Sequence, residues 1–197
     1  MSSKRLARTS LLIALASLVA LACASAEQRV RVRDAGGELR DPFAAAEGRR
    51  ALVLVFVDPD CPISNAYAPE VKRLAAEYGP RGVAFELVYS MPATDAQDVR
   101  RHVADFAYEL PALLDPEQRL ALRAGVVAVP EAAVFLPDGE LAYRGRIDDR
   151  YVDLGRRRAQ PTRRDLCDAL DAILQGRSPE VERTEAVGCP LPGPHGT

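Results

Sequence analysis

The chain has 197 residues, a net charge of −2 at neutral pH and no tryptophan. This length suits one domain with a sizeable hydrophobic core, and the weak negative charge lacks the basic surface by which proteins bind nucleic acid. Its two histidines, His102 and His195, are far apart in the sequence. The composition therefore predicts no nucleic-acid partner, no metal cluster and no cofactor.

The first 26 residues have the three-part pattern of a secretory signal. Basic residues precede an apolar run of about a dozen residues, which is too short for a comfortable membrane span. Ala-Ser-Ala at 24–26 then offers a cleavage site. In the alternative, "VALAC" resembles a bacterial lipoprotein box, and a lipid on Cys23 anchors the protein. Both alternatives predict export to the bacterial periplasm or cell envelope, with membrane contact only through this segment.

We expect residues 27–176 to form one domain and residues 177–197 a C-terminal tail. The first half of the domain alternates between strand-like and helix-like spacing of its apolar residues. The run "ALVLVFV" is continuous and rich in β-branched residues, which is typical of a strand buried on both faces. The patterns predict strands at 28–35, 51–57 and 83–89, and helices at 64–78 and 93–108. The second helix is expected to bury Val99, Val103 and Phe106.

The second half closes with a hairpin and a helix. A short strand at 111–115 and a short helix at 116–126 precede two strands joined by the turn "PDGE". The last helix spans 163–176, and its predicted buried face is Leu166, Cys167, Leu170, Ile173 and Leu174. Residues from 177 onward are rich in proline and glycine, which predicts an irregular tail. The order of elements predicts a mixed sheet with helices on both faces.

This layout resembles the thioredoxin-like fold, an α/β three-layer α/β/α sandwich with a mixed central sheet. A buried strand runs into a cysteine at a helix start in "LVLVFVDPDCPIS". A Val-Pro pair precedes the hairpin in "VVAVPEAAVFLPDG", and an amphipathic helix follows it. The resemblance implies that the Val129–Pro130 peptide bond is cis, that Pro130 lies beside the active cysteine, and that it shapes the substrate groove.

A narrower resemblance covers about residues 45–191. The motifs "CPISNAYAPE", "YRGRIDDRYVDLGRRR" and "AVGCPL" resemble those of exported redoxins of the alkyl hydroperoxide reductase/thiol-specific antioxidant (AhpC/TSA) group. Two departures stand against a standard mechanism. Ser64 occupies the position of the second cysteine of the thioredoxin Cys-x-x-Cys motif, and Asp58 occupies the position of the usual threonine or serine of peroxiredoxins.

Cys61 is the candidate nucleophile because several features at a helix start favour a thiolate. With Cys61 as N-cap and Pro62 in the first turn, free backbone amides and the helix dipole face the sulfur. The Ser64 hydroxyl is expected to donate a further hydrogen bond. Asp58 and Asp60 act in the opposite direction, since a nearby carboxylate disfavours the thiolate. The alternative is a cysteine kept for packing or for a static disulfide.

The partner thiol is expected in the tail. Cys167 is predicted to be a small core residue, whereas Cys189 follows Gly188 and precedes Pro190, which allow a sharp bend. We hypothesise that the tail folds back and that Cys189 forms a disulfide with Cys61, reversible if the protein is redox-active. In the alternative, Cys189 stays free or bonds to another molecule.

The predicted function is therefore that of an exported thiol–disulfide oxidoreductase whose partner is a thiol or disulfide protein. The alternatives are a peroxiredoxin-like peroxidase acting on peroxide, and a non-catalytic binding module with a structural Cys61–Cys189 disulfide. The charge-dense stretch "RGRIDDR" at 144–150 either forms a polar rim near Cys61 or makes ordinary ion pairs at a solvated strand end. His102 is predicted to lie on the surface.

Overall fold

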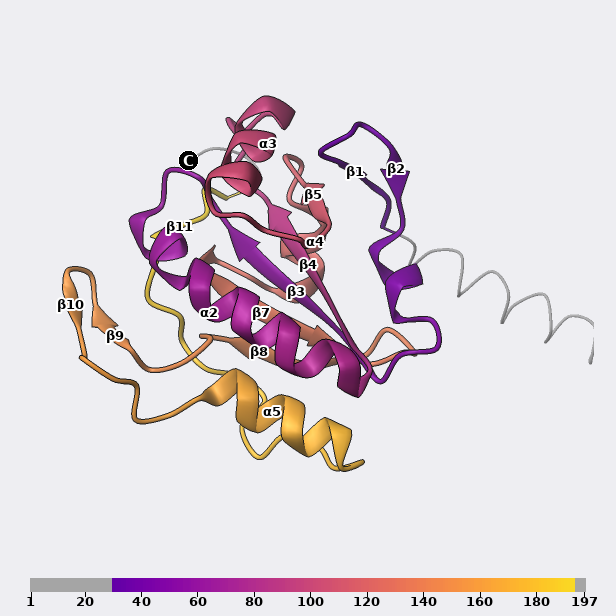
Figure 1. Ribbon diagram of the computed structural model, residues 1–197, viewed down its shortest axis with the longest axis vertical. Coiled ribbons are helices and arrows are strands. Elements are labelled where there is room, and N and C mark those ends of the chain that lie inside the picture. Colours follow the sequence, from indigo (N-terminus) through magenta and orange to yellow (C-terminus); the bar gives the residue numbers. More distant parts are fainter. Residues whose placement is uncertain (1–29, 194–197) are drawn as a thin grey trace, which may run out of the picture. The chain divides into compact units, whose positions relative to one another are not determined.

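The computed structural model of the protein describes residues 30–193 (Figure 1). The predicted signal with Cys23, and His195 near the C-terminus, lie outside the described residues. From Arg31 onward the described chain forms one compact unit. In this part of the chain, each helix is too short or too polar to cross a lipid bilayer.

A seven-stranded mixed sheet forms the centre of the fold in the order β2-β1-β5-β4-β3-β7-β8. β3 pairs in parallel with β4, which pairs in parallel with β5, and the other neighbours are antiparallel. The strands are β1 (Val32–Asp34), β2 (Leu39–Arg40), β3 (Ala51–Val57), β4 (Val83–Tyr89), β5 (Ala112–Leu114), β7 (Glu131–Phe135) and β8 (Leu141–Gly145). All seven residues of β3 are buried, as its continuous apolar run predicts.

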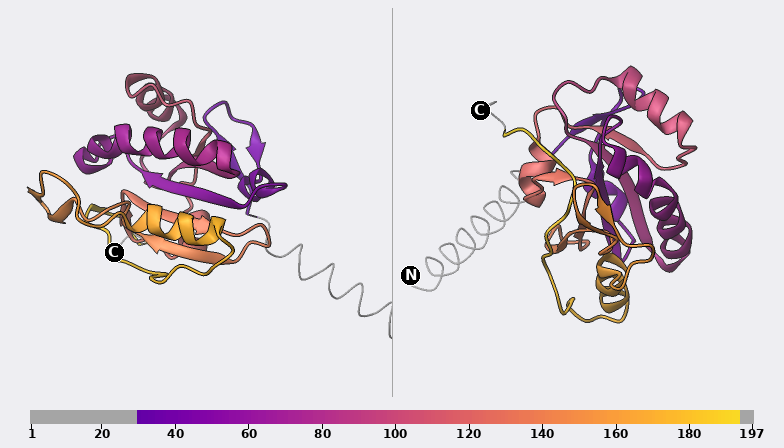
Figure 2. Two further views of the ribbon diagram at one scale, coloured as in Figure 1. Left: turned by 60° about the horizontal axis from the view of Figure 1, so that its bottom comes forward. Right: turned by 90° about the vertical axis from the view of Figure 1, so that its left-hand side faces the viewer.

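Helices cover both faces of this sheet. They are α2 (Pro62–Tyr78), α3 (Ala96–Asp105), α4 (Arg119–Ala124) and α5 (Asp165–Leu174), with 3-10 turns η1 (Pro42–Ala46) and η2 (Gly79–Arg81). Figure 2 shows α2 and α5 on one face and α4 on the other, and an Arg81–Asp171 ion pair of 2.7 Å links α5 to the segment after α2. The α/β thioredoxin-like fold and its mixed central sheet are confirmed.

Two further two-stranded ladders lie outside the main sheet. β9 (Tyr151–Asp153) pairs with β10 (Arg156–Arg157), and β6 (Ala128–Val129) pairs with β11 (Cys189–Pro190). The predicted irregular tail thus contains one short strand, which returns to the segment just before the hairpin. Figure 1 shows the tail, in yellow, running from α5 to β11 near the start of α2.

Five expectations about individual residues are wrong. His102 is 4% exposed rather than on the surface, and with Val99 it forms the buried face of α3. Val103, Phe106 and Leu174 are only partly covered. Phe106 follows the end of α3 at Asp105, and Leu174 is the last residue of α5. Cys167 is partly exposed, since its thiol lies at the edge of the α2–α5 contact, 4.0 Å from an Arg73 guanidinium nitrogen.

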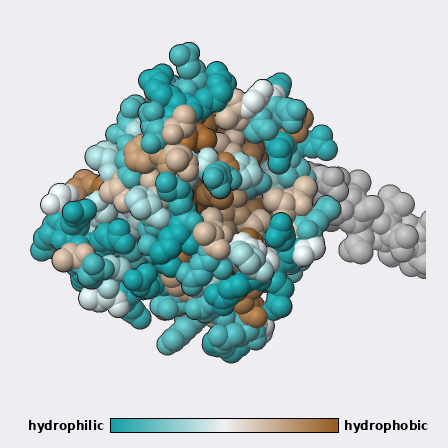
Figure 3. Space-filling model, in the orientation of Figure 1, coloured by the Kyte–Doolittle hydropathy of each residue, from teal (hydrophilic) through white to brown (hydrophobic). Residues whose placement is uncertain are grey.

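The face shown in Figure 3 is mostly hydrophilic, with an apolar area near its centre. This distribution agrees with the amphipathic pattern of the helices, whose polar residues lie outward. Apolar side chains such as Val71 and Leu74 of α2 are 1% exposed. The helices therefore bury the sheet and leave few large apolar side chains on the surface.

Candidate active site

Cys61 lies where β3 ends and α2 begins. The chain turns at Asp58–Asp60, and the Cys61 amide closes this turn by donating to the Asp58 carbonyl oxygen at 3.2 Å. Cys61 has extended backbone angles and is the N-cap residue of α2, with Pro62 in the first turn. Its side chain is completely buried. The predicted N-cap position of this cysteine is confirmed.

Pro130 lies on the other side of the sulfur. The Val129–Pro130 peptide bond is cis, as the resemblance implies. The Cys61 Sγ atom lies 3.4 Å from the carbonyl oxygen of Val129, close enough for the protonated thiol to donate a hydrogen bond. Val129 ends β6, so this short strand forms one wall around the cysteine.

Cys189 reaches the same place from the tail. In the antiparallel β6–β11 ladder, Cys189 stands opposite Val129 and Pro190 opposite Ala128. Cys61 and Cys189 are both free thiols in this structure. The tail therefore folds back over the Pro130 side of the sheet and brings Cys189 to the segment beside Cys61. The pairing of the two cysteines stays a prediction.

The two thiols have opposite pKa shifts. Burial raises the pKa of Cys61, but hydrogen bonds from Cys189 and from the backbone and hydroxyl of Ser64 outweigh it, and the net shift is downward. Burial, the hydrogen bond to Cys61 and the charge on Cys61 raise the pKa of Cys189 to about 12. The pair therefore ionises at Cys61, while Cys189 keeps its proton and donates it to the thiolate.

Ser64 and Asp58 complete the surroundings of the turn. The Asp58 amide donates to Ser64 Oγ at 3.4 Å, which leaves the Ser64 hydroxyl proton to face the sulfur. Burial raises the pKa of Asp58, and the charge of Asp60 adds to this effect. Thr94 donates a hydrogen bond of 3.4 Å to the Asp58 carboxylate. Asp58 thus lies inside the site, while Asp60 is exposed.

A partly buried series of hydrogen bonds, which the sequence patterns did not reveal, supports this turn. Asn65 Nδ2 donates to the Pro59 carbonyl oxygen at 2.8 Å. Its Oδ1 atom faces His102 Nε2 at 2.9 Å, and His102 Nδ1 faces the Tyr89 hydroxyl at 2.8 Å. His102 must therefore donate at Nε2 and accept at Nδ1, which fixes its neutral tautomer. This series of hydrogen bonds connects β4 and α3 to the turn that carries Cys61.

Glu131 stabilises the segment before β6, which lies across the site from the start of α2. This residue follows Pro130, is 1% exposed, and accepts a hydrogen bond of 3.2 Å from the Val127 amide. Arg144 pairs with it at 3.4 Å. The pattern gives no signal for Glu131 except its unusual position in an apolar strand, "EAAVF". The carboxylate holds the segment that leads into β6.

The charged stretch 144–150 makes ion pairs with buried carboxylates. Arg146 contacts Asp165 through two hydrogen bonds of 2.7 and 3.1 Å. Arg150 pairs with Asp148 at 3.2 Å, and Asp148 is 2% exposed. These contacts fit the ion-pair interpretation, but the acidic partners are buried rather than solvated. The stretch fixes the segment between β8 and α5.

The tail contacts the domain at two places before its end. We call residues 182–184 the tail anchor and residues 188–191 the tail cap. In the anchor, the Arg144 amide donates to Glu182 at 2.9 Å, and the Thr184 amide donates to Arg144 at 3.0 Å. The Thr184 hydroxyl also accepts from the Arg146 amide at 3.0 Å and lies 2.9 Å from the Tyr143 hydroxyl. The anchor thus extends the sheet at the edge of β8.

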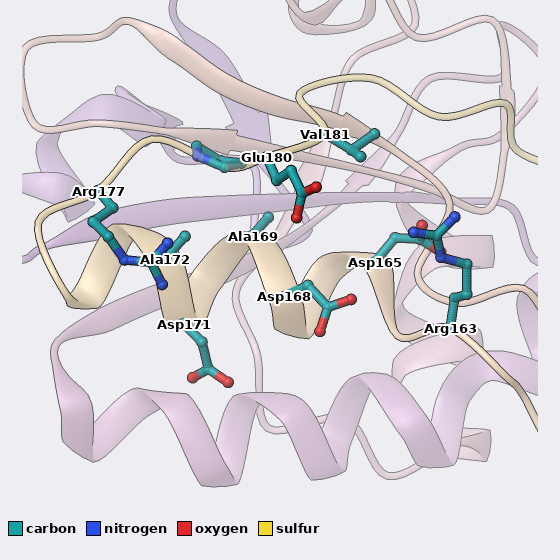
Figure 4. A pocket seen from close by; sticks show the side chains of 10 residues that line it. Arg163, Asp165, Asp168, Ala169, Asp171, Ala172, Arg177, Glu180 and Val181 are labelled. Carbon is teal, nitrogen blue, oxygen red and sulfur yellow. The ribbon is translucent and has the colours of Figure 1, made fainter.

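Between α5 and the start of the tail lies a pocket of about 300 Å³. Figure 4 shows the side chains of Asp168 and Asp171 on α5, with Arg177 and Glu180 from the tail beside them. Its lining contains none of the four residues predicted for the site: Cys61, Ser64, Pro130 and Cys189. This pocket marks where the tail leaves α5, and the thiol chemistry lies elsewhere.

A cysteine at the start of α2 and a cis-proline beside it, on a mixed α/β sheet, define a thioredoxin-like protein. The chain belongs to the Redoxin family, whose model matches residues 34–153. The narrower AhpC/TSA assignment stays a prediction. Comparison with curated proteins finds no match.

Solved structures support the fold. The chain is similar to a hypothetical protein from Sinorhizobium meliloti 1021, with 26% identity, a TM-score of 0.71, and coverage of 83% of this chain and 90% of that chain. An uncharacterized conserved protein from Geobacillus kaustophilus has 25% identity and a TM-score of 0.69, covering 83% and 87%. A secreted Mycobacterium tuberculosis disulfide oxidoreductase has 21% identity and a TM-score of 0.51, covering 75% and 96%.

Proposed function

We propose that the protein is a thiol–disulfide oxidoreductase in which Cys61 is the nucleophile and Cys189 is the resolving thiol. The observation that carries this proposal is the β6–β11 ladder. It places Cys189 opposite Val129, whose carbonyl oxygen lies 3.4 Å from the Cys61 Sγ atom. The opposite pKa shifts of the two thiols agree with this placement. Membership of the Redoxin family supports a thiol or disulfide partner. The roles of Ser64 and Pro130 follow from their positions: Ser64 stabilises the thiolate, and Pro130 shapes the groove beside it.

In the first step, the Cys61 thiolate attacks one sulfur of a partner disulfide. A new bond forms between Cys61 and the partner, the partner's own disulfide breaks, and its second sulfur leaves as a thiolate that takes a proton from solvent. The negative charge on Cys61 is now gone. Two of the causes that raise the pKa of Cys189, its hydrogen bond to Cys61 and the charge on Cys61, disappear with it.

In the second step, Cys189 gives its proton to solvent and attacks the Cys61 sulfur. The bond between Cys61 and the partner breaks, and the partner's sulfur leaves as a thiolate that takes a proton from solvent. The Cys61–Cys189 disulfide forms, and the partner leaves as a dithiol, so the partner is reduced by two electrons and the protein is oxidised by two. An external dithiol regenerates the two thiols, and the same steps in reverse oxidise a partner dithiol. The loss of charge at Cys61 is therefore what activates the second thiol at the right moment.

Peptide mapping under non-reducing conditions tests the proposal. Treating the reduced protein with one equivalent of glutathione disulfide should give a dominant Cys61–Cys189 peptide. The Cys189→Ser variant should instead accumulate glutathione on Cys61, whereas Cys167→Ser should behave like the native protein. A dominant Cys61–Cys167 peptide, or no bridge at all, would contradict the proposed pair.

Peroxidase chemistry is favoured by one observation: Cys61 is completely buried, so a small oxidant reaches it more easily than a protein does. In that case the thiolate takes an oxygen atom from a peroxide, releasing an alcohol or water, and Cys189 then displaces water from the sulfenic acid. Stopped-flow measurement of Cys61 oxidation by hydrogen peroxide separates the functions. A rate no faster than that of free cysteine excludes peroxidase work.

The third possibility is a binding module with a static bridge. A measured reduction potential decides this, because structural disulfides have values below about −300 mV and working couples have higher ones. We propose export to the bacterial cell envelope on the pattern of the first 26 residues alone. Mass measurement of the mature N-terminus distinguishes cleavage after Ala26 from a lipid on Cys23.

A further inference from the structure

The tail cap is held much less firmly than the tail anchor. Its strand β11 has two residues, and Pro190 has no amide hydrogen to donate to the ladder. Beyond it, the Leu191 amide donates to the Val127 carbonyl oxygen at 2.9 Å. Cys189 is half-buried and Pro190 is exposed. The cap therefore rests on the surface of β6 through a few backbone hydrogen bonds.

This weakly held segment lies against the most deeply buried part of the site. Cys61 has no exposed surface, and its Sγ atom lies 3.4 Å from the carbonyl oxygen of Val129, which stands opposite Cys189 of the cap. The other walls are the start of α2 and the end of β6, which belong to the domain and not to the tail. Of the segments around Cys61, the cap is consequently the one that can dissociate from β6 without disturbing the hydrophobic core.

We propose that the tail cap is a tethered occupant of a peptide-binding edge on β6, and that a partner reaches Cys61 by exchanging an extended, cysteine-containing segment of its own for the cap. This inference rests on the proposed function, because it takes Cys61 as the reacting thiol. The partner segment pairs antiparallel with Ala128–Val129, and its disulfide cysteine stands opposite Val129, where Cys189 stands now. Main-chain pairing of this kind supplies affinity with little dependence on side chains.

Gly188 specifies which segments fit in this register. A Cβ atom at position 188 would lie 2.0 Å from the Val129 carbonyl oxygen and 2.6 Å from its carbon. Both are backbone atoms next to the cis-proline, so neither can move aside as a flexible side chain would. The edge therefore selects a glycine before the reacting cysteine, both in the cap and in a partner segment.

Because the anchor tethers the cap, the cap competes with a partner segment for the edge of β6 from within the same molecule. While Thr184 stays bound beside β8, the cap remains close to β6 at an effective concentration of the order of millimolar. A partner must therefore compete with the cap to enter. After the mixed disulfide has formed, the tether returns Cys189 to Cys61, where it forms the internal disulfide and releases the partner as a thiol.

The Gly188→Ala variant tests this inference, because it displaces the cap but keeps both thiols. Iodoacetamide alkylation of Cys61 is measured in the reduced full-length protein by peptide mass spectrometry. Rates are compared on the alkaline plateau, where Cys61 is fully ionised in both proteins, so that a change in pKa does not enter. We expect Gly188→Ala to raise the plateau rate at least tenfold. The control is Gly193→Ala, since a Cβ atom at Gly193 meets nothing within 4 Å.

A second measurement uses synthetic peptides with the tail sequence Val-Gly-Cys-Pro-Leu, whose cysteine is activated as a mixed disulfide. The Gly188→Ala protein should react faster with this peptide than the native protein does, and a Val-Ala-Cys-Pro-Leu peptide should react more slowly. Equal plateau rates in the native and variant proteins would overturn the inference, as would equal rates for the two peptides. Hydrogen exchange at the Leu191 amide verifies that the cap has left in a variant that is otherwise folded.

These outcomes are separate from those of the proposed function. If oxidation of the native protein fails to join Cys61 to Cys189, the oxidoreductase proposal fails whatever the accessibility of Cys61. If the bridge forms but Gly188→Ala leaves the plateau rate unchanged, the exchange of segments fails while the dithiol chemistry stands.

Discussion

Thr184 lies so close to Gly145 that a Cβ atom on Gly145 would come within 2.1 Å of the Thr184 Oγ1 atom and 2.6 Å of its carbonyl oxygen. Gly145 also has a φ of 153°, which side-chain-bearing residues rarely adopt. The glycine of the "YRGR" motif is therefore where the sheet edge receives the tail. Without it, the anchor could not lie against β8.

Replacing Thr184 by alanine should loosen the anchor. The variant loses the contact of the hydroxyl with the Tyr143 hydroxyl and leaves the Arg146 amide without its acceptor, at a cost of about 1–3 kcal/mol for an unpaired group of this kind. Hydrogen exchange at the Thr184 amide should become at least tenfold faster. Glu185→Ala, a change at the exposed neighbouring residue, is the matched control. Unchanged exchange in Thr184→Ala would show that the backbone bonds alone hold the anchor.

The Ser64→Ala variant should make Cys61 a weaker acid. The native pKa of Cys61 is lowered by hydrogen bonds from Cys189 and from Ser64, and the substitution removes the hydroxyl. A hydrogen bond to a charged group contributes about 1.5–3 kcal/mol, so alkylation near neutral pH should slow by about tenfold or more. The pH profile of the alkylation rate measures the shift. Cys167→Ala serves as the control. An unchanged pH profile in Ser64→Ala would show that the Ser64 hydroxyl does not lower the pKa of Cys61.

Burial lowers the pKa of His102, and this should appear in the stability of the protein. Above the ordinary histidine pKa of about 6.5, both the folded and the unfolded states hold neutral His102, so its contribution does not change with pH. Below that value the unfolded chain takes up a proton first, and the free energy of unfolding falls until the folded protein is protonated too. Urea unfolding between about pH 7.5 and 5 should show this loss.

The His102→Gln variant isolates that effect. A glutamine does not titrate, so the part of the pH dependence that comes from His102 should vanish, although the variant should be less stable at pH 7.5 by about 1–3 kcal/mol because the Tyr89 and Asn65 contacts are disturbed. If the native protein and the variant lose stability in parallel on acidification, another group is responsible.

Glu86 should affect the free energy of unfolding in the opposite direction, so that stability is lost as the pH rises. Glu86 lies on β4 and is 3% exposed, and one of its carboxyl oxygens has no hydrogen-bond partner. Burial raises the pKa of this carboxyl to about 7. Protonated Glu86 suits the folded state, so its contribution is fully present below the unfolded pKa of about 4.3 and is lost as the pH rises through 7. Glu86→Gln should therefore stabilise the protein at pH 8 by on the order of 2–4 kcal/mol. Glu109→Gln, at an exposed position, should have no such effect.

The main elements could be predicted because their patterns are strong. The apolar run of β3 and the change to helical spacing after it fix where Cys61 stands, and "PDGE" fixes the hairpin of β7 and β8. Such patterns record which side chains face the core. The same reasoning located Cys189 in the tail, near Cys61, because glycine and proline on either side of it permit a turn.

The burial of individual polar residues could not be predicted from these patterns. His102 has the spacing of the buried face of α3, but a histidine among arginines and aspartates reads as a surface residue. Only the Tyr89 hydroxyl and the Asn65 amide, which come from other elements, make its burial favourable. The same holds for Glu131, whose partner amide at Val127 becomes visible only when the loop before β6 is folded.

Cys61 and Cys189 lie far apart along the chain, one just after β3 and the other in the last strand. A bond between these sulfurs would close a loop that contains almost every helix of the domain. In the chain-entropy model, closing a loop this long adds about 4–5 kcal/mol to the free energy of unfolding. The melting temperature would then be higher for the oxidised protein than for the reduced one. Thermal stability would therefore change with the reducing power of the surroundings.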